Sequence, residues 1–200
     1  MAGFALSTEV SRCLFVVACL CAASQSGLVA WQAPQRHEYR VLATERTSTM
    51  QKELNEAGAA GYRFTAVMGG ETAFGGKEGV VVMERGESGA TYEYRLLATN
   101  RTSTMQKELQ EAADAGYDYR GQTVFSSMFG GDEVTCILEK VAGAEPRGRV
   151  EFKLLATART STMQKELQAA GEQGFEVLGL TVGKTALGGK ELVTIMRRRQ

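Results

Sequence analysis

The stretch LATERTSTMQKEL at residues 42–54 decides how this chain is built, because it occurs three times. It returns at 97–109 and 155–167 with a change at one position only, so that 12 of its 13 residues are the same in all three places. We call this stretch the box. An internal repeat indicates one structural unit that is built several times.

The box lies inside a longer unit of 48 residues. The three copies align without a gap and occupy residues 38–85, 93–140 and 151–198. Of the 35 positions outside the box, only 6 are identical in all copies, so the box is far more uniform than the rest. Short linkers rich in glycine and polar residues separate the copies, as expected of connections.

Each unit predicts the order strand, helix, strand, strand. In the first copy, residues 39–44 alternate between two faces, which is typical of a short strand. A helix is expected from about residue 49 to residue 60, where Met50, Leu54 and Ala57 form an apolar stripe. Two strands joined by a glycine-containing loop complete the unit.

The ends of the helix carry their own signals. Ser48 and Gln51, three residues apart, form a capping-box pattern at the start. A glycine in the left-handed conformation is expected at the end, because only glycine adopts it without strain. These glycines are Gly61, Gly116 and Gly174.

The repeats predict an α+β fold: three tandem β-α-β-β units in one compact body of about nine strands and three helices. A single unit has too few residues to bury much apolar surface alone, whereas three units can cover each other. An arrangement about a pseudo-threefold axis is one option. The strand order stays open, because the third strand of a unit lies either between the first two or beside the second.

The uniform box suggests a small anion site at each helix start. A helix N-terminus offers free backbone N–H groups and a partial positive charge, to which arginine and hydroxyl groups add donors. Phosphate, sulfate or a carboxylate-bearing molecule would fit. The candidate residues are Arg46, Thr47, Ser48, Arg101, Thr102, Ser103, Arg159, Thr160 and Ser161.

A structural role for the same residues is the stronger interpretation. Arg46 and its equivalents would pair with a carboxylate of a neighbouring repeat, for which Glu38 and Glu78 are candidates because both recur in every copy. Recent duplication could also leave a box unchanged. The favoured function is therefore a noncatalytic structural or partner-binding module, and the partner is an unknown protein or a small anion.

The sequence offers few side chains that could carry out catalysis. A catalytic site needs a proton shuttle, a nucleophile or a metal, and no cofactor or metal is expected. The candidate groups beyond residue 23 do not recur between repeats; they are His37, Cys136, Asp114, Asp118 and Asp132. Cys136 lies in an alternating stretch where the other copies have Val81 and Thr194, which predicts a small buried side chain.

The first 37 residues differ from the repeats and are expected to be a signal peptide with a linker. Arg12 precedes an apolar run at 13–23, and cleavage after Ala23 or Ser24 would release an exported protein, periplasmic or secreted. A retained membrane anchor and lipidation at Cys19 are alternatives, and only they would bring the protein to a membrane. Three of the four cysteines lie in this leader, so no internal disulfide is expected afterwards.

The composition fits a folded protein. The 200 residues are 44% hydrophobic and carry 23 basic and 23 acidic side chains. Zero net charge removes the usual electrostatic argument for a nucleic-acid binder, so no nucleic acid is expected as a partner.

All three copies resemble a family of small bacterial domains of unknown function. The resemblance rests on the Glu-Tyr-Arg-Val start at 38–41, Leu54-Asn55, Gly58, Gly61-Tyr62 and the closing Arg85. Members of that family typically begin E-Y-K-V and continue with L-N-x-L-G-x-x-G-W-E-L-V, so a tyrosine or phenylalanine here replaces the usual tryptophan. The resemblance implies the strand-helix-strand-strand unit and brings no activity with it.

Overall fold

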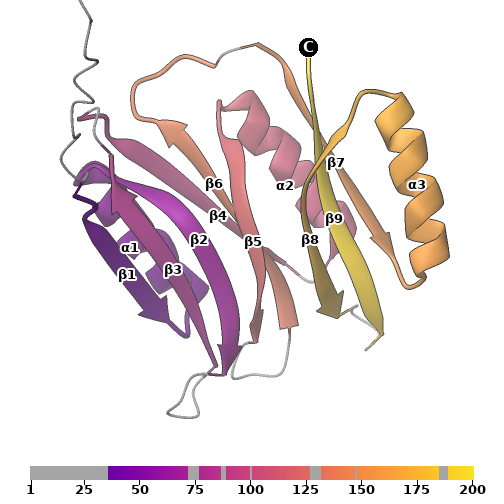
Figure 1. Ribbon diagram of the computed structural model, residues 1–200, viewed down its shortest axis with the longest axis horizontal. Helices are drawn as coiled ribbons and strands as arrows, with labels where there is room; N and C mark the ends of the chain where they lie inside the picture. Colours follow the sequence, from indigo (N-terminus) through magenta and orange to yellow (C-terminus); the bar gives the residue numbers. More distant parts are fainter. Residues whose placement is uncertain are drawn as a thin grey trace, which may run out of the picture. The chain divides into compact units, whose positions relative to one another are not determined.

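A computed structural model gives the fold (Figure 1). It describes residues 36–71, 77–86, 89–99, 101–126, 132–146, 148–184 and 189–200. The leader prediction falls on residues 1–35, and most of the predicted loop glycines fall on 72–76, 127–131 and 185–188, all of which lie outside the described residues.

The three repeats have the predicted order of elements. The first contains β1 (Tyr39–Thr44), α1 (Thr47–Ala59), β2 (Tyr62–Glu71) and β3 (Lys77–Arg85). The second contains β4 (Tyr92–Thr99), α2 (Thr102–Asp114), β5 (Asp118–Ser126) and β6 (Asp132–Val141). The third contains β7 (Val150–Thr157), α3 (Thr160–Glu172), β8 (Glu176–Lys184) and β9 (Lys190–Arg199). The α+β class and the three similar units are confirmed.

Each repeat forms an antiparallel sheet of three strands, and the third strand lies in the middle. The orders are β1-β3-β2, β4-β6-β5 and β7-β9-β8. This decides between the two strand orders that the sequence left open. In each repeat the second strand has an irregularity in its pairing at the same place, for example between Phe64 and Ala66. The outer edges of each sheet are its first and second strands.

The helices begin earlier than predicted, and the capping-box prediction is wrong. Arg46 is the N-cap residue of α1, without a side-chain cap, and its own N–H donates to Oγ1 of Thr44 at 3.2 Å. The same arrangement recurs at Arg101 and Arg159. Ser48 therefore lies inside the first turn. The glycine prediction is confirmed, since Gly61 follows the helix with a φ of 84°.

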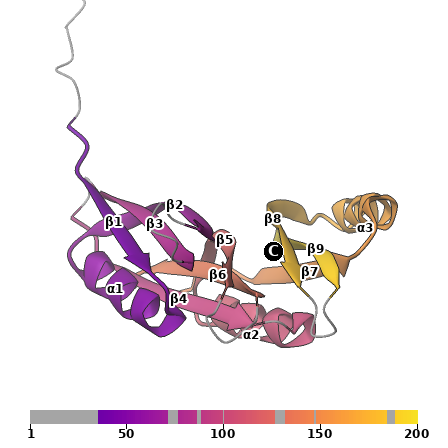
Figure 2. The same cartoon turned by 90° about the horizontal axis from the view of Figure 1, so that it is seen from below.

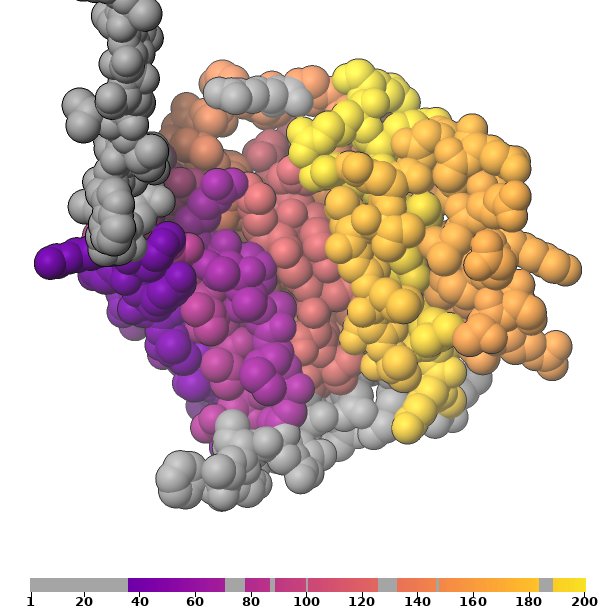
Figure 3. All heavy atoms as spheres, viewed as in Figure 1, coloured from indigo at the N-terminus to yellow at the C-terminus, as the bar shows by residue number. Residues whose placement is uncertain are grey.

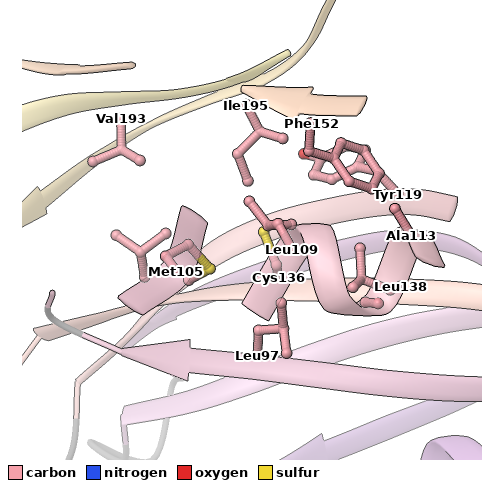
Figure 4. Packing of buried hydrophobic residues seen from close by; sticks show 12 residues of the cluster. Leu97, Met105, Leu109, Ala113, Tyr119, Cys136, Leu138, Phe152, Val193 and Ile195 are labelled. Carbon is pink, nitrogen blue, oxygen red and sulfur yellow. The ribbon is translucent and has the colours of Figure 1, made fainter. Parts of the chain in front are cut away.

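The apolar stripe of each helix covers its own sheet. Met50, Leu54 and Ala57 of α1 are fully buried, as predicted. In the second repeat, Met105 and Leu109 of α2 pack with Leu97 and Cys136 of the sheet. Figure 4 shows that Ile195 of the third repeat also points into this cluster. The core is thus shared between neighbouring repeats.

Neighbouring repeats are joined by the same elements at both junctions. Helix α1 packs against β4 and α2 against β7, while β2 lies along β5 and β5 along β8 (Figure 2). No such extensive contact links elements of the first and third repeats within the described residues. Figure 3 shows the repeats following one another from indigo to yellow. The three units therefore form an open series with two different ends.

Candidate functional site

The candidate anion residues of the three boxes lie at the starts of the three helices, and most of them are exposed to solvent. In the second and third repeats Arg101, Thr102, Arg159 and Thr160 are exposed, and Arg46 is exposed in the first. Within the described ranges none of the three arginines pairs with a carboxylate, so the predicted pairing of Arg46 with Glu38 or Glu78 is wrong. The helix starts keep backbone N–H groups without a side-chain cap.

The surroundings of the second box are poorly suited to an anion. A hollow of about 20 Å³ is lined by Arg101, Thr102 and Glu191, which is space for one water molecule. A wider hollow of about 360 Å³, open to solvent, includes Ser103 but also the carboxylate of Glu166. Neither hollow is lined by a candidate anion residue of the first or third box, so the three helix starts are not gathered around either hollow.

The box contributes to the junction between repeats through its glutamine. The side-chain amide of Gln51 donates to the carbonyl oxygen of Tyr94 at 2.6 Å and accepts from the N–H of Leu96 at 2.6 Å. One helical turn later, Asn55 donates to the same carbonyl at 3.0 Å and accepts from the N–H of Tyr94 at 2.9 Å. We call this pair of side chains the amide clasp. It satisfies the outer edge of β4, whose backbone groups have no neighbouring strand on that side.

The second junction has an amide clasp of the same design. Gln106 of α2 donates to the carbonyl of Phe152 at 2.9 Å and accepts from the N–H of Leu154 at 2.7 Å. Gln110 donates to Val150 and accepts from Phe152. The sequence alone does not predict this role. The available signal is a glutamine that is identical in all copies and is followed four residues later by another side-chain amide. Its equivalents on α3, Gln164 and Gln168, are exposed.

A buried carboxylate marks the junction of the first two repeats. The side chain of Glu139 on β6 is 1% exposed and pairs with Arg63 of the first repeat at 3.0 Å and with Arg120 at 2.7 Å. The hydroxyl of Tyr94 donates to Glu139 at 2.9 Å and accepts from the N–H of Phe64 at 2.8 Å. Burial, with the nearby Glu139 carboxylate, raises the pKa of Tyr94 far above its usual range.

The second junction uses the same positions with the charges exchanged. Asp118 occupies the position of Arg63, and Arg197 that of Glu139. Nη1 of Arg197 lies 2.6 Å and 2.7 Å from the two carboxylate oxygens of Asp118. Arg197 also pairs with Glu176 at 2.5 Å. Both junctions therefore hold an ion pair between a second strand and the central strand of the next repeat.

Each repeat is closed by its first and last residues. Glu38 pairs with Arg85 at 2.6 Å, and the equivalent pairs are Glu93 with Lys140 and Glu151 with Arg198. Hydrogen bonds from Arg85 and then from Tyr62 lower the pKa of Glu38 to about 2. The cations also lie over the aromatic ring that follows each helix, as Arg85 does over Tyr62 at 4.4 Å. The recurring glutamate is thus a structural group within its own repeat.

A hollow lined by several charged side chains lies beside the second repeat and has a volume of about 290 Å³. Its lining mixes both signs of charge, with Asp118 and Glu139 opposite Arg120 and Lys140. These groups already bind each other or a neighbour. The hollow is therefore enclosed mainly by groups that hold the repeats together.

The other candidate reactive groups are dispersed. Cys136 is fully buried, as predicted, and burial raises its pKa far above the usual range, which disfavours the reactive thiolate. His37 hydrogen-bonds to Glu84 at the exposed start of the first repeat. Among the described residues no group of three or more His, Cys, Asp or Glu side chains is arranged to hold a metal ion.

Comparisons with protein-family models, with curated proteins and with solved structures found no match to this chain. In the part of the chain that the structure describes, no helix is long and apolar enough to cross a membrane.

Proposed function

We propose that this protein is an exported, noncatalytic structural module that binds a protein partner through the surfaces of its joined repeats. One observation carries the proposal: the most uniform segment of the sequence places Gln51 and Gln106 in the junctions between repeats. Buried charge is used in the same way, because Glu139 binds cations from two repeats. A glutamine of the uniform box and a buried carboxylate thus both hold neighbouring repeats together.

A rescue experiment in cells tests this role. A strain that lacks the protein is compared with strains that carry variants, and the measured quantity is the rescue of whatever defect the deletion causes. Variants His37→Gln and Cys136→Val remove candidate reactive groups, and valine already stands at the equivalent position 81. We expect both to rescue fully. The double variant Gln51→Ala/Gln106→Ala loosens both junctions and should not rescue.

Loss of rescue in either single variant, in a protein that remains folded, would contradict a noncatalytic role. Rescue by the double variant, although its junctions are weakened, would also contradict the structural role. The export part of the proposal is tested separately by cell fractionation and N-terminal sequencing. A mature chain that begins after Ala23 or Ser24 is expected, and a chain that retains Met1 in the cytoplasm would contradict it.

Anion binding is the second candidate function, and the uncapped helix starts favour it. Phosphate would then raise the melting temperature of the protein. The triple variant Arg46→Met/Arg101→Met/Arg159→Met should lose that shift, and its own stability should change little because the arginines are exposed. Absence of any phosphate-dependent shift in the unaltered protein would exclude this function.

A further inference from the structure

The two ends of the series of repeats are unlike each other and are both apolar. Seven large hydrophobic side chains are exposed in the described residues, and six of them lie at the ends. Those on the first repeat are Tyr39, Val41 and Met68, and those on the third repeat are Val177, Leu180 and Val182. Their equivalents inside the series lie at junctions. Exposed apolar patches of this kind mark surfaces that bind another protein.

At the first end of the series lies the outer edge of β1. The equivalent edges of β4 and β7 are each covered by an amide clasp. Tyr39 is 57% exposed, whereas its equivalents Tyr94 and Phe152 are each 2% exposed beneath the preceding helix. Val41 corresponds to Leu96 and Leu154, whose N–H groups bind a glutamine. No described residue offers such a glutamine to β1. Among the described residues, no helix therefore covers β1 in the way that α1 covers β4 and α2 covers β7.

At the other end, α3 carries the two glutamines of an amide clasp, but they bind no edge strand of the described residues. Gln164 and Gln168 on α3 are exposed, and Leu167 is only partly buried although Leu54 and Leu109 are fully buried. The space around Gly171 also shows that no described repeat packs on this face of α3. A Cβ added at its equivalent Gly58 would lie 2.3 Å from the carbonyl oxygen of Tyr92, whereas a Cβ at Gly171 would meet nothing within 4 Å.

The sheet surfaces of the two ends are also complementary. Inside the series, Phe64 lies against Gly121, and Tyr119 lies against Gly179. At the ends the corresponding residues are Val177 on the third repeat and Ala66 on the first. The aromatic residue is replaced by the smaller valine and the glycine by the larger alanine, so the same contact can form with a smaller difference in size.

We infer that two copies of this protein associate head to tail, with α3 and β8 of one copy against β1 and β2 of the next. The contact repeats the internal junction: Gln164 and Gln168 would bind the backbone of Tyr39 and Val41. Such a contact joins two different surfaces, so it extends to a ring if the rotation closes and to a filament if it does not. This inference rests on the proposed structural role and gives it a partner.

One pair of residues opposes the contact. By equivalence with Arg63 and Glu139, Glu176 of one copy would face Glu84 of the next, and like charges repel. Each carboxylate already has a partner, because Arg197 pairs with Glu176 and His37 hydrogen-bonds to Glu84, and Glu176 is more than half exposed. The repulsion weakens the contact, and it can be converted into attraction by the substitution Glu176→Arg.

Complementary blocking variants test the contact by sedimentation velocity, with the protein purified in the form that cells deliver. Gly171 on α3 is equivalent to Gly58, which approaches Tyr92 at the internal junction. Gly171→Leu therefore places a bulky side chain in the proposed contact, and leucine favours the helix more than glycine does. Val41→Pro removes one N–H from the outer side of an edge strand, where proline is tolerated. Ala169→Leu adds the same leucine on the solvent side of α3 and is the control.

The unaltered protein and Ala169→Leu are expected to associate as concentration rises. Gly171→Leu and Val41→Pro should each be monomeric alone, and their equimolar mixture should form a dimer and nothing larger, because one intact contact remains. Glu176→Arg should associate about tenfold more tightly than the unaltered protein, whereas Glu145→Arg in the linker should not.

Four results would overturn the inference. The unaltered protein stays monomeric at every concentration; or a single blocking variant still dimerises, which indicates a symmetric contact; or the mixture of the two variants stays monomeric. Association that appears only when the chain is cut to begin at Arg36 would show that residues 1–35 occupy the edge, and this also overturns it. Sedimentation reports the contact alone, so its failure leaves the rescue results for the proposed role intact.

Discussion

Gln51 on α1 donates a hydrogen bond to the backbone carbonyl of Tyr94 on β4 at 2.6 Å, across the junction of the first two repeats. The side-chain amide takes the place of a missing strand, because it offers one donor and one acceptor to the edge of β4. The same contact joins Gln106 to Phe152. Repeat proteins depend on such nearest-neighbour contacts for stability, so the amide clasp is the element to test first.

The substitution Gln51→Ala should destabilise the protein, whereas Gln164→Ala should not. Removal of the Gln51 amide leaves the N–H of Leu96 without an acceptor at a partly buried site, which costs about 1–2 kcal/mol. Gln164 holds the same position in the third box but is exposed, so its removal should change the free energy of unfolding by less than about 0.5 kcal/mol. Chemical denaturation measures both. Equal effects would contradict a role of Gln51 in the junction.

Replacement by alanine should have opposite effects on stability at two equivalent glycines. A Cβ at Gly58 would lie 2.3 Å from the carbonyl oxygen of Tyr92, so Gly58→Ala must push the first two repeats apart and should cost about 1–3 kcal/mol. Gly171 has open space around it, and Gly171→Ala should stabilise α3 by up to about 1 kcal/mol. Thermal melting of dilute protein distinguishes the two, and a stabilising Gly58→Ala would show that the junction is not tightly packed.

Glu139→Gln should weaken the first junction by about 2 kcal/mol. The carboxylate is buried between two arginines, and its neutralisation leaves them without a counter-charge; their own partial exposure limits the cost. Glu84 is the equivalent residue of the first repeat, where no preceding repeat covers it and its side chain is 33% exposed. Glu84→Gln should therefore have a much smaller effect on the free energy of unfolding of the monomer. A larger effect from Glu84→Gln would refute this explanation.

The Glu38–Arg85 pair predicts a specific dependence of stability on pH. The pKa of Glu38 falls from 4.5 to about 2 on folding, so the folded protein binds this proton more weakly. The stabilisation from this group is therefore fully present above about pH 5 and is lost as the pH falls toward 2. The difference in melting temperature between the unaltered protein and Glu38→Gln should shrink over that interval. A difference that stays constant from pH 6 to pH 3 would contradict it.

Much of the fold could be predicted because three copies of a unit repeat the same local signals. The strand at residues 39–44, the stripe of Met50, Leu54 and Ala57, and the glycine after each helix follow from local features, and the structure has all of them. The sequence predicts a helix start at residue 49, whereas α1 begins two residues earlier at Thr47. Ser48 and Gln51 fit a capping box by spacing, but the glutamine turns toward the next repeat and leaves the helix start to Arg46.

The junctions could not be predicted because they join residues 30 or more positions apart. Spacing within one repeat carries no information on which edge strand a glutamine reaches, so the sequence predicts only a role for Gln51 in its own helix. The same limit led to the expected pairing of Arg46 with Glu38, whereas the carboxylate binds Arg85 at the other end of the repeat. Identity of the box between copies marked it as unusual, and only the packing of α1 on β4 showed that its glutamine holds the junction.

Hydrogen exchange at two backbone amides measures the amide clasp most directly. Leu96 and Leu154 lie on outer edge strands, and their N–H groups are bound by Gln51 and Gln106. NMR exchange should find both amides protected in the unaltered protein. Gln51→Ala should speed exchange at Leu96 by about tenfold or more while Leu154 is unchanged, and Gln106→Ala should do the reverse. Exchange that is fast at both amides already, or that neither substitution alters, would contradict the account of how the repeats are joined.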